Sequence, residues 1–110
     1  MELSVLQDEC CAPSPKVMTV DQAEALMPCV KALADPVRLR IFHHVAVSGG
    51  SVCFCHLPET FGVSQPTLSH HLKKLTEAGL VNREMRGRWA HYTPRPEGLA
   101  ALRALLGELP

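Results

Sequence analysis

Aromatic residues are scarce in this sequence, and long apolar runs are absent. One Trp, one Tyr and three Phe occur among 110 residues, so the core is expected to be mostly aliphatic. No apolar run approaches the ~20 residues that a membrane-spanning helix needs. The first nine residues include three acidic side chains and no basic one, which is not the pattern of a signal peptide. We therefore expect a cytoplasmic protein that does not enter a membrane.

The chain also lacks an excess of charge of either sign. Eleven basic and eleven acidic residues give a formal net charge of zero, which argues against a protein that is basic all over. The charges are unevenly placed, however. Residues 63–95 include six basic and two acidic side chains, whereas residues 1–62 include four basic and seven acidic ones. A local basic surface on a neutral protein is typical of sequence-specific DNA binding, because phosphate contacts then position the protein.

Motifs of several enzyme classes are missing as well. The sequence has no Gly-rich phosphate loop, and no nucleophile–base pair or pair of carboxylates stands out. The Ser-His neighbours in "LSHHL" are better explained by contact with DNA. We therefore do not expect an enzyme, but a single domain of ordinary size with a packed core.

Five segments have the caps and apolar spacing of helices, over residues 19–34, 35–48, 51–61, 64–78 and 97–109. The clearest start signals are Asp35, which is followed by Pro36 at the first helical position, and Ser64. In the fourth segment one face is apolar and should point into the core. This face carries Leu68, Leu72 and Leu75.

The third and fourth helical segments are joined by a tight turn at Gly62, which gives a helix-turn-helix. Two strand-like segments follow, "LVNREM" and "RWAHYT", and the Gly between them permits a hairpin. The predicted fold is therefore mostly α with a small β-hairpin, a winged helix-turn-helix over residues 19–110. Residues 1–18 include two prolines in "CCAPSPK" and are expected to form a flexible N-terminal arm that carries thiol ligands.

The predicted DNA contacts come from the outer face of the fourth helical segment and from the hairpin. Four polar side chains are placed to contact base edges in the major groove: Gln65, Thr67, Ser69 and His70. Four basic side chains are placed to contact phosphates: Lys73, Lys74, Arg86 and Arg88. The predicted partner is double-stranded operator DNA.

Five cysteines in a reducing compartment favour metal or redox chemistry over structural disulfides. Cys29 lies in an apolar helical pattern and is expected in the core. The predicted metal ligands are the other four: Cys10, Cys11, Cys53 and Cys55. On an ideal helix, residues two apart point about 200° from each other. Cys53 and Cys55 can therefore hold one ion only if Cys53 lies in a non-helical lead-in.

Thiolates select soft or borderline ions, such as Cd(II), Pb(II), Zn(II), As(III) and Sb(III). Trivalent arsenic takes three thiolates, which Cys10, Cys11 and Cys55 would supply. Adding Cys53 gives four donors, which suit tetrahedral Cd(II) or Zn(II). His56 is either a further donor or a solvated side chain. The sequence leaves open both the ion and the role of a thiol redox switch on the same scaffold.

Three segments, "KALADPVRLRI", "SQPTLSHHLKKLTEAGLV" and "GRWAHY", together resemble the ArsR/SmtB family of bacterial metal-responsive repressors. The resemblance covers residues 33–92. It implies a homodimeric winged helix that represses its own operon and leaves DNA when a metal or metalloid binds. It also implies that the first and last helices, residues 19–34 and 97–109, form the dimer interface.

The resemblance further implies where the inducer binds. In one type of family site, a Cys-X-Cys starts the first helix of the helix-turn-helix, and Cys53 and Cys55 match it. Some members add thiols from the N-terminal arm, often of the other subunit, as Cys10 and Cys11 would. Members with "CVCDLC" have a third cysteine where this chain has Pro58. A second site type uses Asp, His and Glu on the last helix, but "GLAALRALLGEL" has neither Asp nor His, so that zinc site is not expected.

Overall fold

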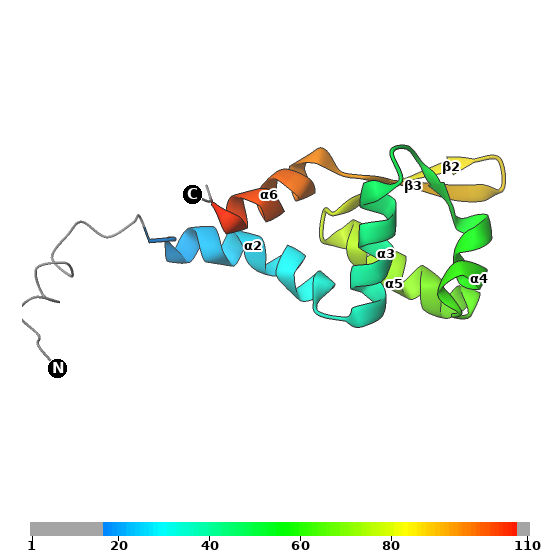
Figure 1. Ribbon diagram of the computed structural model, residues 1–110, viewed down its shortest axis with the longest axis horizontal. Helices are drawn as coiled ribbons and strands as arrows, with labels where there is room; N and C mark the ends of the chain where they lie inside the picture. The colour runs from blue at the N-terminus through cyan, green and yellow to red at the C-terminus, as the bar shows by residue number, and fades with distance from the viewer. Residues whose placement is uncertain (1–16, 108–110) are drawn as a thin grey trace, which may run out of the picture.

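The computed structural model describes residues 17–107 of the chain (Figure 1). The α-helices of this part are α2 (Val20–Leu33), α3 (Pro36–Val47), α4 (Leu57–Phe61), α5 (Gln65–Glu77) and α6 (Pro96–Leu106). A short 3-10 helix, η1 (Phe54–His56), precedes α4. The strands are β1 (Val52–Cys53), β2 (Val81–Arg86) and β3 (Trp89–Pro94), and they form an antiparallel sheet in the order β1-β3-β2. Together these elements confirm the predicted winged helix-turn-helix.

Three helices begin where the sequence predicts, because a polar side chain caps each of them. Thr19, Asp35 and Ser64 each accept a hydrogen bond from the backbone N–H three residues later, at 3.1, 3.0 and 3.3 Å. These bonds satisfy donors that the first turn of a helix leaves without a partner. The starts of α2, α3 and α5 are therefore fixed by local chemistry.

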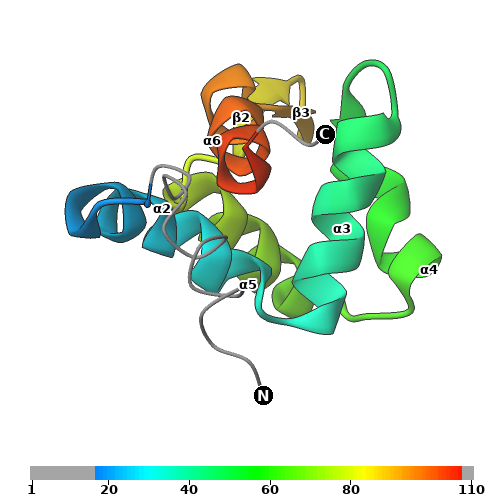
Figure 2. The ribbon, with the colours of Figure 1, turned by 60° about the vertical axis from the view of Figure 1, so that its left-hand side comes forward.

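Helix α5 lies at the centre of the molecule, between α2 and α3 (Figure 2). Its three inward leucines, Leu68, Leu72 and Leu75, are completely buried, as predicted. Each buried Leu contributes about 1.5–3 kcal/mol of hydrophobic stabilisation relative to an exposed one. The largest fully buried side chains are all aliphatic, which confirms the expected character of the core.

The segment before α4 differs from the prediction of one helix from residue 51. It forms β1, then η1, and only then α4. Val52 pairs with Tyr92 and Cys53 with His91, which adds a third strand to the hairpin. A two-residue strand is too short to show an alternating pattern in the sequence. Its pairing with β3 is a tertiary contact that local propensity does not encode.

Helices α2 and α6 lie side by side at one end of the molecule (Figures 1 and 2). Several large apolar side chains on these two helices remain exposed: Val20, Met27, Val30, Leu105 and Leu106. Helix α6 ends three residues before its predicted end, and residues 108–110 fall outside the described part. None of the helices in residues 17–107 has both the length and the apolar character that a membrane span requires. Residues 1–16 of the predicted arm, which include Cys10 and Cys11, also lie outside the described residues.

Candidate DNA-binding surface and thiol site

The turn between α4 and α5 consists of residues 62–64. Gly62 ends α4 with a φ of +64°, in the left-handed region that glycine adopts without strain. Leu57 of α4 and Leu68 of α5 are both buried, at 1% and 0% exposure, and anchor the two helices to one core. The opposite side of α5 is thereby held toward solvent.

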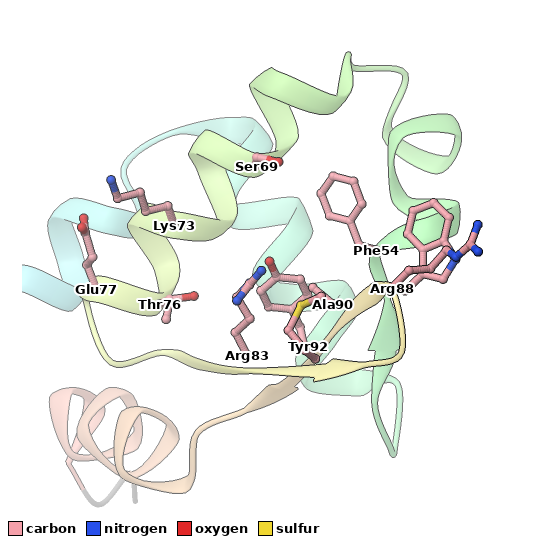
Figure 3. A pocket seen from close by; sticks show the side chains of 11 residues that line it. Phe54, Ser69, Lys73, Thr76, Glu77, Arg83, Arg88, Ala90 and Tyr92 are labelled. Carbon is pink, nitrogen blue, oxygen red and sulfur yellow. The ribbon is translucent and has the colours of Figure 1, made fainter.

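All eight predicted DNA contacts are exposed: Gln65, Thr67, Ser69, His70, Lys73, Lys74, Arg86 and Arg88. Six belong to α5 and two to the tip of the β2–β3 hairpin. Ser69, Lys73 and Arg88 line one hollow of about 580 Å³ between α5 and the hairpin (Figure 3). The Thr67 hydroxyl accepts a hydrogen bond of 2.9 Å from Ser64, so it also belongs to the helix cap.

The Arg86 side chain already has hydrogen-bond partners within the protein. Its Nε donates to Glu84 at 2.7 Å, and its Nη1 donates to Ser51 at 3.0 Å. Both charged side chains are more than half exposed, and exposed ion pairs of this kind contribute about 0–1 kcal/mol. A phosphate contact from Arg86 would therefore compete with these two local partners.

Arg83 was not among the predicted DNA contacts, yet it lines the same hollow as Lys73 and Arg88 (Figure 3). The signal was present in the sequence. Side chains alternate along a strand, so Arg83 lies on the face of β2 opposite to Glu84. The hollow thus combines cationic side chains from the helix and from the wing with one carboxylate, Glu77, and the excess of positive charge is suited to a phosphate group.

A small network of polar contacts connects Arg38 of α3 with His71 of α5. Arg38 donates from Nε to the Ala32 carbonyl at 2.7 Å, and its Nη1 lies 3.3 Å from Nδ1 of His71. Burial lowers the pKa of His71, and the nearby Arg38 charge lowers it further, while the Asp35 carboxylate opposes both. The pKa of Asp35 is also lowered, chiefly because its side chain accepts the backbone N–H of Arg38. The network favours a neutral His71 beside a charged Asp35.

Cys53 and Cys55 converge on each other at the entry to α4. They form a disulfide, with their Cα atoms 5.3 Å apart. Cys53 lies in β1 with extended backbone, and its sulfur accepts the N–H of Cys55 at 3.2 Å. The non-helical lead-in that shared ligation requires is therefore present. In the reduced form, the same backbone would hold two thiolates close enough to bind one soft ion.

The other thiol and His56 differ from this pair. Cys29 is 8% exposed and donates to the Ala78 carbonyl at 3.5 Å, which confirms its predicted place in the core. His56 is exposed. Residues 17–107 contain no group of three or more His, Cys, Asp or Glu side chains that could hold a metal ion. Cys53 and Cys55 fit a thiophilic ion as two donors, so a complete site needs a further donor from elsewhere.

Comparison with known proteins places this arrangement in a family. Residues 35–83 match the model described as "Bacterial regulatory protein, arsR family". An arsenical resistance operon repressor of Bacillus subtilis is 42% identical over 72 residues, which cover 66% of this chain and 68% of that protein. The chain belongs to the arsR family. A Synechocystis protein named as a transcriptional repressor SmtB homolog is 37% identical over 79 residues, covering 72% of this chain and 58% of the relative.

A solved structure of a possible ArsR-family regulator agrees with this membership. The homodimeric winged helix-turn-helix DNA-binding domain from Mycobacterium bovis, solved by NMR, superposes with a TM-score of 0.65 and 25% identity, covering 86% of each chain. The region that matches the arsR model runs from the cap of α3 into β2. It includes the helix-turn-helix and the Cys53–Cys55 pair, so both belong to the part of the chain by which the family is recognised. As an arsR-family member, the chain is a transcription regulator.

Proposed function

We propose that this protein is a homodimeric repressor that binds operator DNA and releases it when a thiophilic ion binds its cysteines. The observation that carries the proposal is the convergence of Cys53 and Cys55 where β1 leads into α4. Helix α4 packs against α5, the helix with the exposed polar face. An ion bound at this point would act on the element that supports the DNA-binding helix.

The DNA-binding part rests on α5 and the wing. Gln65, Thr67, Ser69 and His70 contact base edges in the major groove, in the usual docking of a helix-turn-helix. Phosphates are contacted by Lys73, Lys74, Arg86 and Arg88, together with Arg83 in the hollow. Arg88 and Arg83 contribute more than Arg86, because Arg86 first has to leave Glu84.

The ion site combines two parts of the chain. Cys55 and Cys53 supply donors from the folded domain, and Cys10 and Cys11 supply donors from residues 1–18. Three thiolates suit As(III) or Sb(III), and four suit Cd(II), Pb(II) or Zn(II). The arsenical resistance operon repressor of Bacillus subtilis supports a metalloid among these candidates. Ion binding requires the reduced thiols that the cytoplasm maintains.

Dimerisation follows from the apolar surface of α2 and α6. Leu105 and Leu106 are 44% and 68% exposed in the single chain, and Val30 of α2 is 38% exposed. The homodimeric Mycobacterium bovis domain supports a symmetric partner on this surface. A dimer would present two α5 helices to two half-sites of an operator.

The test is release of operator DNA by a panel of ions. Fluorescence anisotropy of a labelled operator is measured with As(III), Sb(III), Cd(II), Pb(II) and Zn(II) under reducing conditions, and with the thiol oxidant diamide in a separate series. At least one ion should lower operator affinity by about 5–150-fold, the range of typical allosteric coupling. Release by the oxidant alone, with no response to any ion, would replace ion sensing by a thiol redox switch.

A further inference from the structure

Phe54 stands between the two converging cysteines in the sequence, and its side chain is partly buried. In β1, Val52 pairs with the buried Tyr92, whereas Cys53 pairs with His91. Phe54 is the first residue of η1 and directly follows β1. Both Val52 and Phe54 pack against the hydrophobic core. The sulfurs of Cys53 and Cys55, the residues on either side of Phe54, are joined to each other.

The Phe54 ring projects into the hollow between α5 and the hairpin (Figure 3). This is the hollow that Lys73, Arg83 and Arg88 also line. One three-residue segment therefore carries both the paired sulfurs and a ring that lines the hollow between the DNA-binding elements. No other side chain of η1 or α4 lines this hollow.

We propose that Phe54 is the positioning residue that couples ion binding at Cys53 and Cys55 to the spacing between α5 and the wing. The proposal rests on the ion-sensing function above and adds the route by which the signal reaches DNA. When an ion binds at this pair, the Cys53–Cys55 backbone is fixed in a new position. The attached ring then shifts in the hollow, and the cationic side chains of α5 and the wing no longer match the phosphate spacing.

The energetic condition is that the ion and the DNA prefer different positions of the same ring. An ion changes DNA affinity only by its differential affinity for the two conformations. By linkage, DNA must weaken ion binding by the same factor. Removal of the ring should therefore leave each ligand bound at nearly its own affinity and remove the factor that connects them.

The chain has its own probe of this hollow. Trp89 is the single tryptophan of the sequence, is 40% exposed, and lines the hollow together with Phe54. A shift of the Phe54 ring should change the fluorescence of Trp89 in the absence of DNA. This readout separates a moving ring from a general loss of stability.

The experiment compares full-length wild-type protein with Phe54→Ala, Phe54→Leu and Phe54→Tyr. Phe61→Leu is the matched control, because Phe61 is also a partly buried ring against the core but lies outside this hollow. As(III) and Cd(II) binding, operator affinity with and without each ion, and Trp89 fluorescence are measured under reducing conditions. Phe54→Leu keeps an apolar side chain, so a folded variant without the ring is available.

We expect Phe54→Ala and Phe54→Leu to keep ion and operator affinities within about threefold of wild type. In wild-type protein the ion should lower operator affinity by a factor of about 5–150. In these two variants the factor should be below about two, and the ion should no longer change the fluorescence of Trp89. Phe54→Tyr and Phe61→Leu should respond as wild type does. A folded Phe54→Leu with the full wild-type factor would overturn the proposal. If neither As(III) nor Cd(II) makes the wild-type protein release operator DNA, the ion-sensing function itself would be refuted instead.

Discussion

Cys29 and Cys55 are the same residue type in two environments, and their surroundings separate their roles. Cys29 is buried in α2 and donates to the Ala78 carbonyl. Cys55 is only half-buried and faces a second sulfur. A thiol enclosed by the core is shielded from ions in solution, whereas a more accessible pair can bind a soft ion when it is reduced. The chemistry of a cysteine here follows from its packing.

The first prediction concerns His71 and pH. The pKa of His71 is lowered in the folded protein, so the unfolded chain takes up the proton first as the pH falls through about 6.5. The stability that a neutral His71 provides is complete above this pH and is lost as the pH falls toward its folded pKa. Urea denaturation of His71→Gln at pH 7.5, 6.5 and 5.5 should therefore show a flatter pH dependence than wild type. The exposed neighbour His70→Gln is the control, and an unchanged slope for His71→Gln would refute the assignment.

At the scale of elements, the wing shows how local ion pairs sort neighbouring arginines. In the described residues, Arg86 pairs with Glu84, while Arg83 and Arg88 form no ion pair and line the hollow beside α5. A side chain without a local partner loses less when it turns to a phosphate. The three arginines should therefore contribute unequally to DNA affinity.

The second prediction tests this inequality. Arg88→Ala and Arg83→Ala should each weaken binding to all sequences and flatten the slope of log affinity against log salt by about one. Arg86→Ala should change the slope less. Operator affinity is measured at several salt concentrations, with Arg103→Ala on α6 as the control. A larger effect for Arg86 than for Arg88 would contradict the assignment from the geometry.

The third prediction concerns the start of α6. A Cβ on Gly98 would lie 2.6 Å from the Gly79 carbonyl oxygen and 3.0 Å from the Leu80 Cα, so both backbones would have to move. Gly98→Ala should lower the free energy of unfolding by about 1–3 kcal/mol, the usual cost of overpacking. Gly50→Ala is the matched control, because a Cβ there meets nothing within 4 Å. Urea denaturation that shows equal stability for the two variants would refute the close approach.

The parts of the fold that the sequence predicts are those that local chemistry determines. Caps such as Asp35 and Ser64, and the leucine face of α5, are complete within one segment. Strand β1 is different, because only its pairing with β3 makes residues 52 and 53 a strand. The place of Arg83 in the hollow and the ring of Phe54 against the wing likewise depend on contacts between distant segments.

For the whole molecule, the exposed apolar surface on α2 and α6 is the basis of the proposed dimer. A hydrophobic surface of this kind is usually covered by a partner, and the arsR fold offers a homodimeric example. The dimer surface on α2 and α6 lies at the opposite end of the molecule from α4 and the cysteine pair that precedes it (Figure 1).

The fourth prediction tests assembly. Leu106→Glu should give a folded monomer, because Leu106 is 68% exposed in the single chain and its replacement disturbs no buried contact there. In a dimer the carboxylate would be buried without a partner, which is costly. Val47→Glu on α3, at 65% exposure, is the matched control and should stay dimeric. Analytical ultracentrifugation that finds an intact Leu106→Glu dimer would remove α6 from the interface.

The most direct measurement for the account as a whole is operator release by As(III) and Cd(II) for five single Cys→Ser variants. Cys10→Ser, Cys11→Ser and Cys55→Ser should bind operator as wild type does but lose most of the response to either ion, because each leaves an incomplete site. Cys53→Ser should lose more of the Cd(II) response than of the As(III) response, since a fourth thiolate matters only for the tetrahedral ion. Cys29→Ser should respond normally. If the Cys10→Ser, Cys11→Ser and Cys55→Ser variants release operator DNA at the same ion concentrations as wild type, the account is contradicted. Ion sensing would then not depend on these thiols.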